Sequence, residues 1–264
     1  MMRSSNPFLS NKSFNVTHSG GHESMSLEGV ANKTGMLLMV VLFFAAMTWM
    51  ITWGEIQAIQ EAADAGLQPT AGGWTMAFLA IGFIASFIVA MIIWFTRPEN
   101  PQVLMFTYAG FEGILLGSFS AIAEVMVPGI AIQAVGLTFG IFLTMLFIYR
   151  LGLINPSKNF YIAISSAMGA IFLIYFASII LWMIPGAPQV PFIHGSGYIG
   201  IGFSLLVIAI AALSFVMDFD YIEKGVEQRA PKKMEWWGAF GLLVTLVWLY
   251  IEIVRLLLKL AARD

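Results

Sequence analysis

Residues 217–260 read MDFDYIEKGVEQRAPKKMEWWGAFGLLVTLVWLYIEIVRLLLKL. A polar segment separates two apolar runs, and each run carries a carboxylate. Asp218 closes the first run, and Glu252 interrupts the second. An ionisable side chain at membrane depth costs a few kcal/mol or more, so it usually serves a function. Two acids on neighbouring apolar helices suggest a site for protons or cations.

The composition of the whole chain is that of a membrane protein. The 264 residues are 59% hydrophobic and 11% charged, with a mean hydropathy of +0.85. Soluble domains carry about 25% charged residues. We therefore predict that the lipid bilayer is the main partner of the chain. The net charge of −2 gives no indication of nucleic acid binding, and the absence of cysteine excludes disulfides and thiolate metal sites.

Seven apolar stretches are long enough to cross a hydrocarbon core of about 30 Å. They predict an all-α polytopic membrane protein with spans at about 35–53, 75–95, 103–124, 130–149, 160–184, 198–218 and 237–260. Residues 1–33 are polar and lack the layout of a signal peptide. We expect a flexible N-terminal tail over 1–33 and a seven-helix membrane domain over 34–264.

The positive charges predict the orientation. Loops 54–74, 125–129 and 185–197 contain no Lys or Arg, whereas the tail and loops 96–102, 150–159 and 219–236 contain ten. Lys and Arg favour the cytoplasmic side, so the N-terminus is predicted to be cytoplasmic. The seventh segment then either spans and ends outside, against Arg255, Lys259 and Arg263, or re-enters and ends inside.

Local signals predict turns and helix contacts. The prolines of residues 96–101 (TRPENP) indicate a tight turn, and Ser157 is a plausible helix cap. Gly113 with Gly117, and Gly136 with Gly140, form two GxxxG patterns. Such patterns allow close approach between membrane helices, so they predict packing rather than function.

Glu112 lies in the middle of the third span, near Gly110, Gly113 and Gly117. These glycines indicate that it faces another helix rather than lipid. Two interpretations remain open. Glu112 is either a ligand for protons or cations inside the bundle, or a neutral acid whose hydrogen bonds lock helix packing.

Asp218 and Glu252 also have alternative interpretations. Asp218 could be an ordinary interfacial carboxylate, followed by an i,i+4 pair of Asp220 with Lys224, and Glu252 could form an i,i+3 ion pair with Arg255. A straight helix from Trp237 would place Glu252 about 22 Å along its axis. The two acids could approach each other if residues 233–241 lie along the interface and the span begins near 242.

Enzyme chemistry has little support. The three histidines, His18, His22 and His194, lie in the tail and in a loop. The chain has no zinc-protease motif, nucleophile elbow or phosphate-binding glycine loop. We expect no catalytic residues and no cofactor.

The chain resembles the Bax inhibitor-1 (transmembrane Bax inhibitor motif, YccA-like) family, in its bacterial branch. The resemblance rests on residues 217–260 and on the segments SSNPFLSNKSF, GVANKTGMLL and YAGFEGILLGSFSAI. It implies two three-helix layers around a central seventh helix, in an integral protein of the bacterial inner membrane.

The resemblance also implies a pH-sensitive calcium leak channel, gated by an acidic pair on the last two helices. Asp218 and Glu252 match that pair and would hold calcium weakly and transiently. Arg97 matches a basic residue that contacts the acidic site, and Asp220, Arg255 and Glu112 are possible supporting residues. The chain departs from the family by using Glu at 252 and by about ten additional residues between the two acids.

Two other functions stay open. The protein could modulate a membrane protease or another quality-control complex through residues 1–33, as some members of the resembled family do. It could also be a proton-coupled transporter that uses Glu112. Neither alternative requires Asp218 or Glu252.

Overall fold

The computed structural model describes residues 24–66, 73–154, 156–184, 193 and 195–263. In this part of the chain the secondary structure is helical, apart from an isolated bridge between Ser24 and Pro231. The helices are α1 (Leu27–Asp64), α2 (Trp74–Thr96), α3 (Gln102–Met126), α4 (Ile130–Arg150), α5 (Lys158–Met183), α7 (Tyr198–Glu227) and α8 (Met234–Ala261). All seven are long and apolar enough to cross a membrane.

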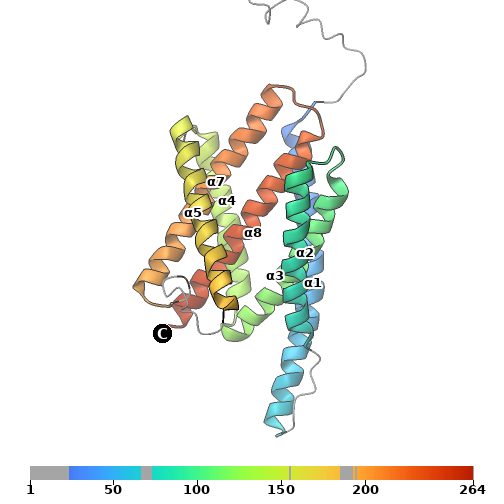
Figure 1. Cartoon of the computed structure of the whole chain (residues 1–264), viewed down its shortest axis with the longest axis vertical. Helices are drawn as coiled ribbons and strands as arrows, with labels where there is room; N and C mark the ends of the chain where they lie inside the picture. The colour runs from blue at the N-terminus through green and yellow to red at the C-terminus, as the bar shows by residue number, and fades with distance from the viewer. Residues whose placement is uncertain (1–23, 67–72, 155, 185–192, 194, 264) are drawn as a thin grey trace, which may run out of the picture.

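The helices form two groups around α8 (Figure 1). Helix α3 packs against both α1 and α2 on one side, and α7 packs against α4 and α5 on the other. Helix α8 lies between the groups and contacts α1, α3, α4 and α7. The predicted arrangement of two three-helix layers around a central seventh helix is therefore confirmed.

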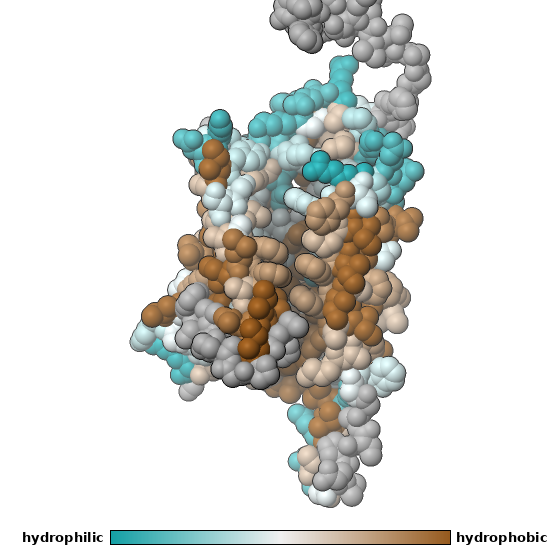
Figure 2. Space-filling model, in the orientation of Figure 1, coloured by the Kyte–Doolittle hydropathy of each residue, from teal (hydrophilic) through white to brown (hydrophobic). Residues whose placement is uncertain are grey.

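Successive helices run in opposite directions, so successive connections lie at opposite ends of the bundle. We call the end where α1 begins the amino end. It also holds the α2–α3, α4–α5 and α7–α8 turns. The opposite end, where α8 stops, is called the carboxyl end. Figure 2 shows a hydrophobic band between more hydrophilic ends, which is the pattern expected of a bilayer-spanning protein.

Several helices extend beyond the predicted spans. Helix α1 begins at Leu27, so residues 27–33, predicted to be tail, form its first two turns; residues 1–23 lie outside the described residues. The same helix continues to Asp64, and α7 continues to Glu227. Hydropathy marks only the part of a helix inside the hydrocarbon, whereas a helix continues until a breaker such as Gly66 or Pro231.

A clasp at the amino end explains the early start of α1. Ser26 caps the helix by accepting a hydrogen bond from the Gly29 backbone N–H at 2.9 Å. Both the backbone N–H and the hydroxyl of Ser26 donate to Oε1 of the buried Glu235, at 2.9 and 3.0 Å. Lys33 forms an ion pair with Oε2 of the same carboxylate. We call Ser26, Lys33 and Glu235 the N-terminal clasp, which ties the start of α1 to the start of α8.

Carboxylates cap two helices at the carboxyl end. Glu55 accepts hydrogen bonds from the backbone N–H groups of Trp74 and Thr75, at 3.1 and 2.7 Å. Glu124 accepts from those of Gly129 and Ala131, at 2.6 and 3.1 Å. These N–H groups have no partner within their own helix, and the helix dipole favours a negative charge there. The predicted cap at Ser157 is confirmed, since it accepts from the Phe160 N–H at 3.2 Å.

The two GxxxG patterns have different surroundings. A Cβ at Gly113 or Gly117 would collide with the backbone of α1, at Val41 and Ala45 respectively, so this pattern forms the predicted close contact. A Cβ at Gly136 or Gly140 would meet nothing within 4 Å. The second pattern therefore makes no close helix contact in the described part of the chain.

Candidate functional site: carboxylates along the central helix

Asp218 faces α8 from the last third of α7. It is half-buried, and its Oδ2 accepts a hydrogen bond of 2.7 Å from the Thr245 hydroxyl. Gly241, one turn before Thr245, leaves room for the carboxylate, since a Cβ there would lie 3.4 Å from Oδ1. Asp218 is thus directed into the α7–α8 contact and is not a freely solvated interfacial residue.

The acids that follow Asp218 are held by tyrosines of other helices. Asp220 accepts hydrogen bonds from Tyr161 of α5 and from Lys224, its predicted i,i+4 partner. Glu223 accepts from Tyr149 of α4. The C-terminal part of α7, at the amino end of the bundle, is therefore joined to both other helices of its layer through hydroxyl–carboxylate bonds.

Glu252 is deeply buried in the central helix, with 1% of its surface exposed. Its Oε1 accepts a hydrogen bond of 2.8 Å from the Tyr175 hydroxyl of α5. The same oxygen lies 3.2 Å from Nη1 of Arg255, which confirms the predicted i,i+3 ion pair. In the described part of the chain, Oε2 of Glu252 is the one buried side-chain oxygen or nitrogen without a hydrogen-bond partner.

Arg255 and Lys259 continue this polar row toward the carboxyl end. Arg255 also donates to the Ile193 carbonyl at 3.4 Å, and its guanidinium lies over the Tyr175 ring. Lys259 is buried and donates to the Gly200 carbonyl and the Ser204 hydroxyl of α7, at 3.0 and 2.8 Å. One face of α8 is therefore polar from Glu252 to its end.

Asp218 and Glu252 do not contact each other. Asp218 bonds to Thr245, and Glu252 follows seven residues later, which is about 10 Å along the helix axis. Helix α8 is continuous from Met234, so residues 233–241 do not form the separate interfacial segment that would bring the acids together. The two acids occupy separate positions along the α7–α8 hairpin.

The other predicted supporting residues lie away from this row. Arg97 is exposed at the C-terminal end of α2, with φ 41°, and no hydrogen bond or ion pair among the described residues joins it to either acid. Glu112 is buried between α3 and α2, with Ser86 and Tyr108 as its polar neighbours. Its predicted orientation toward another helix is confirmed, but that helix is α2, within one layer.

The described residues form no cluster of three or more His, Cys, Asp or Glu side chains that could hold a metal ion. Calcium takes six to eight oxygen ligands, and the α8 positions of Thr245, the partner of Asp218, and of Glu252 are about 10 Å apart by helical rise. The described residues therefore supply no calcium site shared by the two acids.

Sequence reasoning missed the hydroxyl partners of the acids, namely Tyr149, Tyr161, Tyr175 and Thr245, together with Lys259 and Ser204. The available signal was the position of Tyr175 and Thr245 inside apolar spans. A hydroxyl at that depth needs a partner, which here is a carboxylate on another helix.

Seven membrane-crossing helices, with carboxylates buried along the central one, define a polytopic membrane protein with an acidic intramembrane row. The family model described as Bax inhibitor 1 like matches residues 6–262, nearly the whole chain, and the chain belongs to this family. A search of curated proteins and a search of solved structures found no match.

Proposed function

We propose that the protein is a pH-sensitive leak channel for calcium or other cations, in which Glu252 is the gating group and Asp218 a second position on the path. The observation that supports this most directly is the unpaired Oε2 of the buried Glu252. Leaving a buried acceptor unsatisfied costs about 1–3 kcal/mol, so such a group in a native protein invites a functional explanation. A passing cation would satisfy it.

The contacts of Glu252 suggest how the gate would act. The carboxylate holds Arg255 and Tyr175, and through Tyr175 it joins α5 to α8. Loss of its negative charge would weaken both bonds. We propose that neutralisation of the acidic row, Asp218 with Glu252, opens the path, so cation flux rises as the pH falls. The separation of Asp218 from Glu252 makes repulsion between them a poor gate.

The test is calcium flux into liposomes that contain the purified protein, at pH 6 and at pH 8. Wild type is expected to conduct faster at pH 6. Glu252→Gln mimics the neutral acid and is expected to conduct at the pH 6 rate at both pH values. Glu99→Gln, an exposed acid in the α2–α3 turn, is the matched control and is expected to behave as wild type. Absence of flux above empty liposomes at both pH values would reject the proposal.

The quality-control alternative is tested by truncation. The N-terminal clasp begins at Ser26, so a deletion of residues 1–33 would damage the fold as well as the tail. Deletion of 1–23 leaves the clasp intact. Loss of binding to a membrane protease in this truncated protein, with calcium flux absent from wild type, would favour the alternative.

The transporter alternative depends on Glu112. This acid lies between α2 and α3, and its polar neighbours belong to the same two helices. The position favours the packing interpretation. We expect Glu112→Gln to leave calcium flux and its pH profile unchanged, whereas a loss of substrate-dependent proton uptake in this variant would support a transporter.

A further inference from the structure

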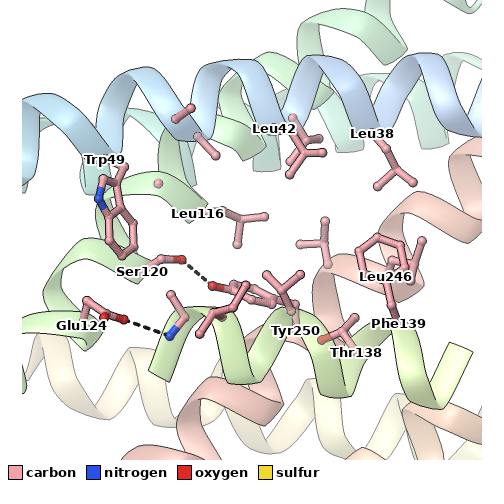
Figure 3. Close-up of a pocket in the computed structure, with 18 of the residues that line it drawn as sticks. Leu38, Leu42, Trp49, Leu116, Ser120, Glu124, Thr138, Phe139, Leu246 and Tyr250 are labelled. Atoms are coloured by element: carbon pink, nitrogen blue, oxygen red, sulfur yellow. Dashed lines mark hydrogen bonds between the residues drawn. The ribbon is translucent and has the colours of Figure 1, made fainter. Parts of the chain in front are cut away.

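A cleft of about 560 Å³ lies between the two helix layers (Figure 3). Its walls come from α1, α3, α4 and α8, and the deepest of them are formed by Leu116, Leu246 and Val247, which are buried. The volume is in the range of about 300–1,000 Å³ found for small-molecule sites. The cleft is distinct from the carboxylate row, since neither Asp218 nor Glu252 lines it.

The cleft opens toward the bilayer between α1 and α4. In the described part of the chain these two helices do not contact each other, although both line the cleft. Residues of both helices form an exposed apolar rim, with Leu42 and Met50 on α1 and Ile132 and Phe139 on α4. The medium in front of the opening is therefore hydrocarbon rather than water.

Most polar groups of the cleft are already satisfied inside the protein, and the indole N–H of Trp49 is the exception among the described lining residues. Ser120 and Tyr250 form a hydrogen bond of 2.6 Å with each other, which Figure 3 shows on the cleft wall. The Glu124 carboxylate caps α4, and the Thr138 hydroxyl donates to the Ala134 carbonyl at 2.7 Å. These groups leave little hydrogen-bonding capacity for a polar ligand, so the walls favour an apolar occupant.

The dimensions fit one lipid tail. Along α1 the lining residues run from Leu38 to Met50, which is twelve steps of helical rise or about 18 Å. One leaflet of a hydrocarbon core of about 30 Å is about 15 Å deep. An empty apolar cleft would forfeit dispersion contacts on its walls, and water would find few partners in it.

From these observations we infer that the cleft is a binding site for one acyl chain of a bilayer phospholipid, which enters between α1 and α4 and packs against α8. The chain would fill the space between the layers and contact the central helix at Leu246 and Val247. This inference does not depend on the proposed ion conduction.

Photo-crosslinking tests the site directly. The full-length protein is reconstituted with a phosphatidylcholine that carries a diazirine near the end of one acyl chain, irradiated, and mapped by mass spectrometry. Crosslinks are expected on the cleft-facing residues Val135, Leu246 and Val247. The variant Val135→Phe narrows the cleft and is expected to reduce crosslinking at Leu246 and Val247 at least fivefold.

The matched control is Leu143→Phe. Leu143 lies on the same helix, is exposed, and does not line the cleft, so its variant is expected to retain the wild-type crosslinks. A second pair on α1 separates filling of the cleft from misfolding: Ala46→Phe points into the cleft, whereas Met47 is exposed outside it. Ala46→Phe should reduce the crosslinks, and Met47→Phe should not.

Three outcomes would overturn the inference. The first is crosslinking confined to bilayer-facing residues outside the cleft. The second is equal crosslinking at Leu246 and Val247 in wild type and in both cleft-filling variants. The third is displacement of the probe by free fatty acid but not by unlabelled phosphatidylcholine, which would assign the cleft to a fatty acid. Loss of the cleft crosslinks on addition of unlabelled phosphatidylcholine supports the inference.

Discussion

The hydroxyl of Tyr175 in α5 donates a hydrogen bond of 2.8 Å to Oε1 of Glu252 in α8. Helix α5 otherwise packs on α7, so this bond is one of the few links between the outer helix and the central one. The ring of Tyr175 also lies 4.8 Å from the guanidinium carbon of Arg255, which completes a three-residue contact. The arrangement places a titratable group where its charge affects the association of two helices.

Tyr175→Phe removes the hydroxyl and keeps the ring over Arg255. A hydrogen bond to a charged group contributes about 1.5–3 kcal/mol, so we expect the free energy of unfolding at pH 8 to fall by about that amount. The measurement is the loss of helical circular dichroism during titration with a denaturing detergent. Tyr221→Phe is the control, because Tyr221 is exposed. Equal stability of the two variants would show that the bond to Glu252 is unimportant.

The N-terminal clasp leads to a prediction about charge. Glu235 is 1% exposed and pairs with the half-buried Lys33, and loss of a hydrogen bond to a charged group costs about 1.5–3 kcal/mol. We expect Lys33→Met to destabilise the protein by that amount, because it leaves Glu235 without its cation. The double variant Lys33→Met/Glu235→Gln should recover part of the loss.

The clasp is measured by thermal unfolding in detergent, with Lys158→Met as the control. Lys158 is an exposed lysine at the start of α5. If Lys33→Met and Lys158→Met unfold at the same temperature, the ion pair contributes nothing to stability. If the stability lost in the double variant equals the sum of the losses in Lys33→Met and in Glu235→Gln alone, Lys33 and Glu235 are not coupled.

The two GxxxG patterns permit a matched comparison. Gly117→Ala places a methyl group against Thr48 and the Ala45 carbonyl of α1, and overpacking of this kind costs about 1–3 kcal/mol. Gly140→Ala meets nothing within 4 Å and removes a helix-destabilising glycine, so it should be neutral or stabilising by up to about 1 kcal/mol. The free energy of unfolding of both variants is measured by detergent-induced unfolding. Equal changes in the two variants would contradict the α1–α3 contact.

These glycines also show which parts of the fold were predictable. Hydropathy located every span because twenty apolar residues are required to cross the hydrocarbon core, whatever the partners of the helix. It could not distinguish Gly117 from Gly140, since the pattern is the same and only the neighbouring helix differs. The start of α1 could not be predicted either, because it depends on the contact between Ser26 and Glu235, which are 209 residues apart in the sequence.

The sequence pointed to the two acids of the α7–α8 hairpin but not to their geometry. Asp218 and Glu252 were identified because a charge inside an apolar run is conspicuous, and the Glu252–Arg255 pair followed from helical spacing. The position of Tyr175 and Thr245 inside apolar spans indicates that each hydroxyl needs a partner, but it does not show which acid that partner is. The separation of the two acids depends on the continuity of α8 through Gly238 and Gly241, which a local pattern does not determine.

Thr245 provides the final prediction, because it donates to Asp218 at 2.7 Å and is otherwise enclosed in the α7–α8 contact. Thr245→Val keeps the shape of the side chain and removes the donor, so Asp218 is left without this partner. If Asp218 lies on the ion path, the pH at which calcium flux is half-maximal should change in Thr245→Val.

Thr245→Ser retains the hydroxyl and is expected to keep the wild-type pH profile, which separates loss of the hydrogen bond from loss of a methyl group. The measurement is calcium flux into liposomes across a series of pH values for wild type and both variants. Asp218→Asn completes the comparison. In this background, with a neutral amide at 218, adding Thr245→Val should not change the pH profile of the flux. A pH profile unchanged in Thr245→Val and in Asp218→Asn would remove Asp218 from the path and leave Glu252 as its one acidic group.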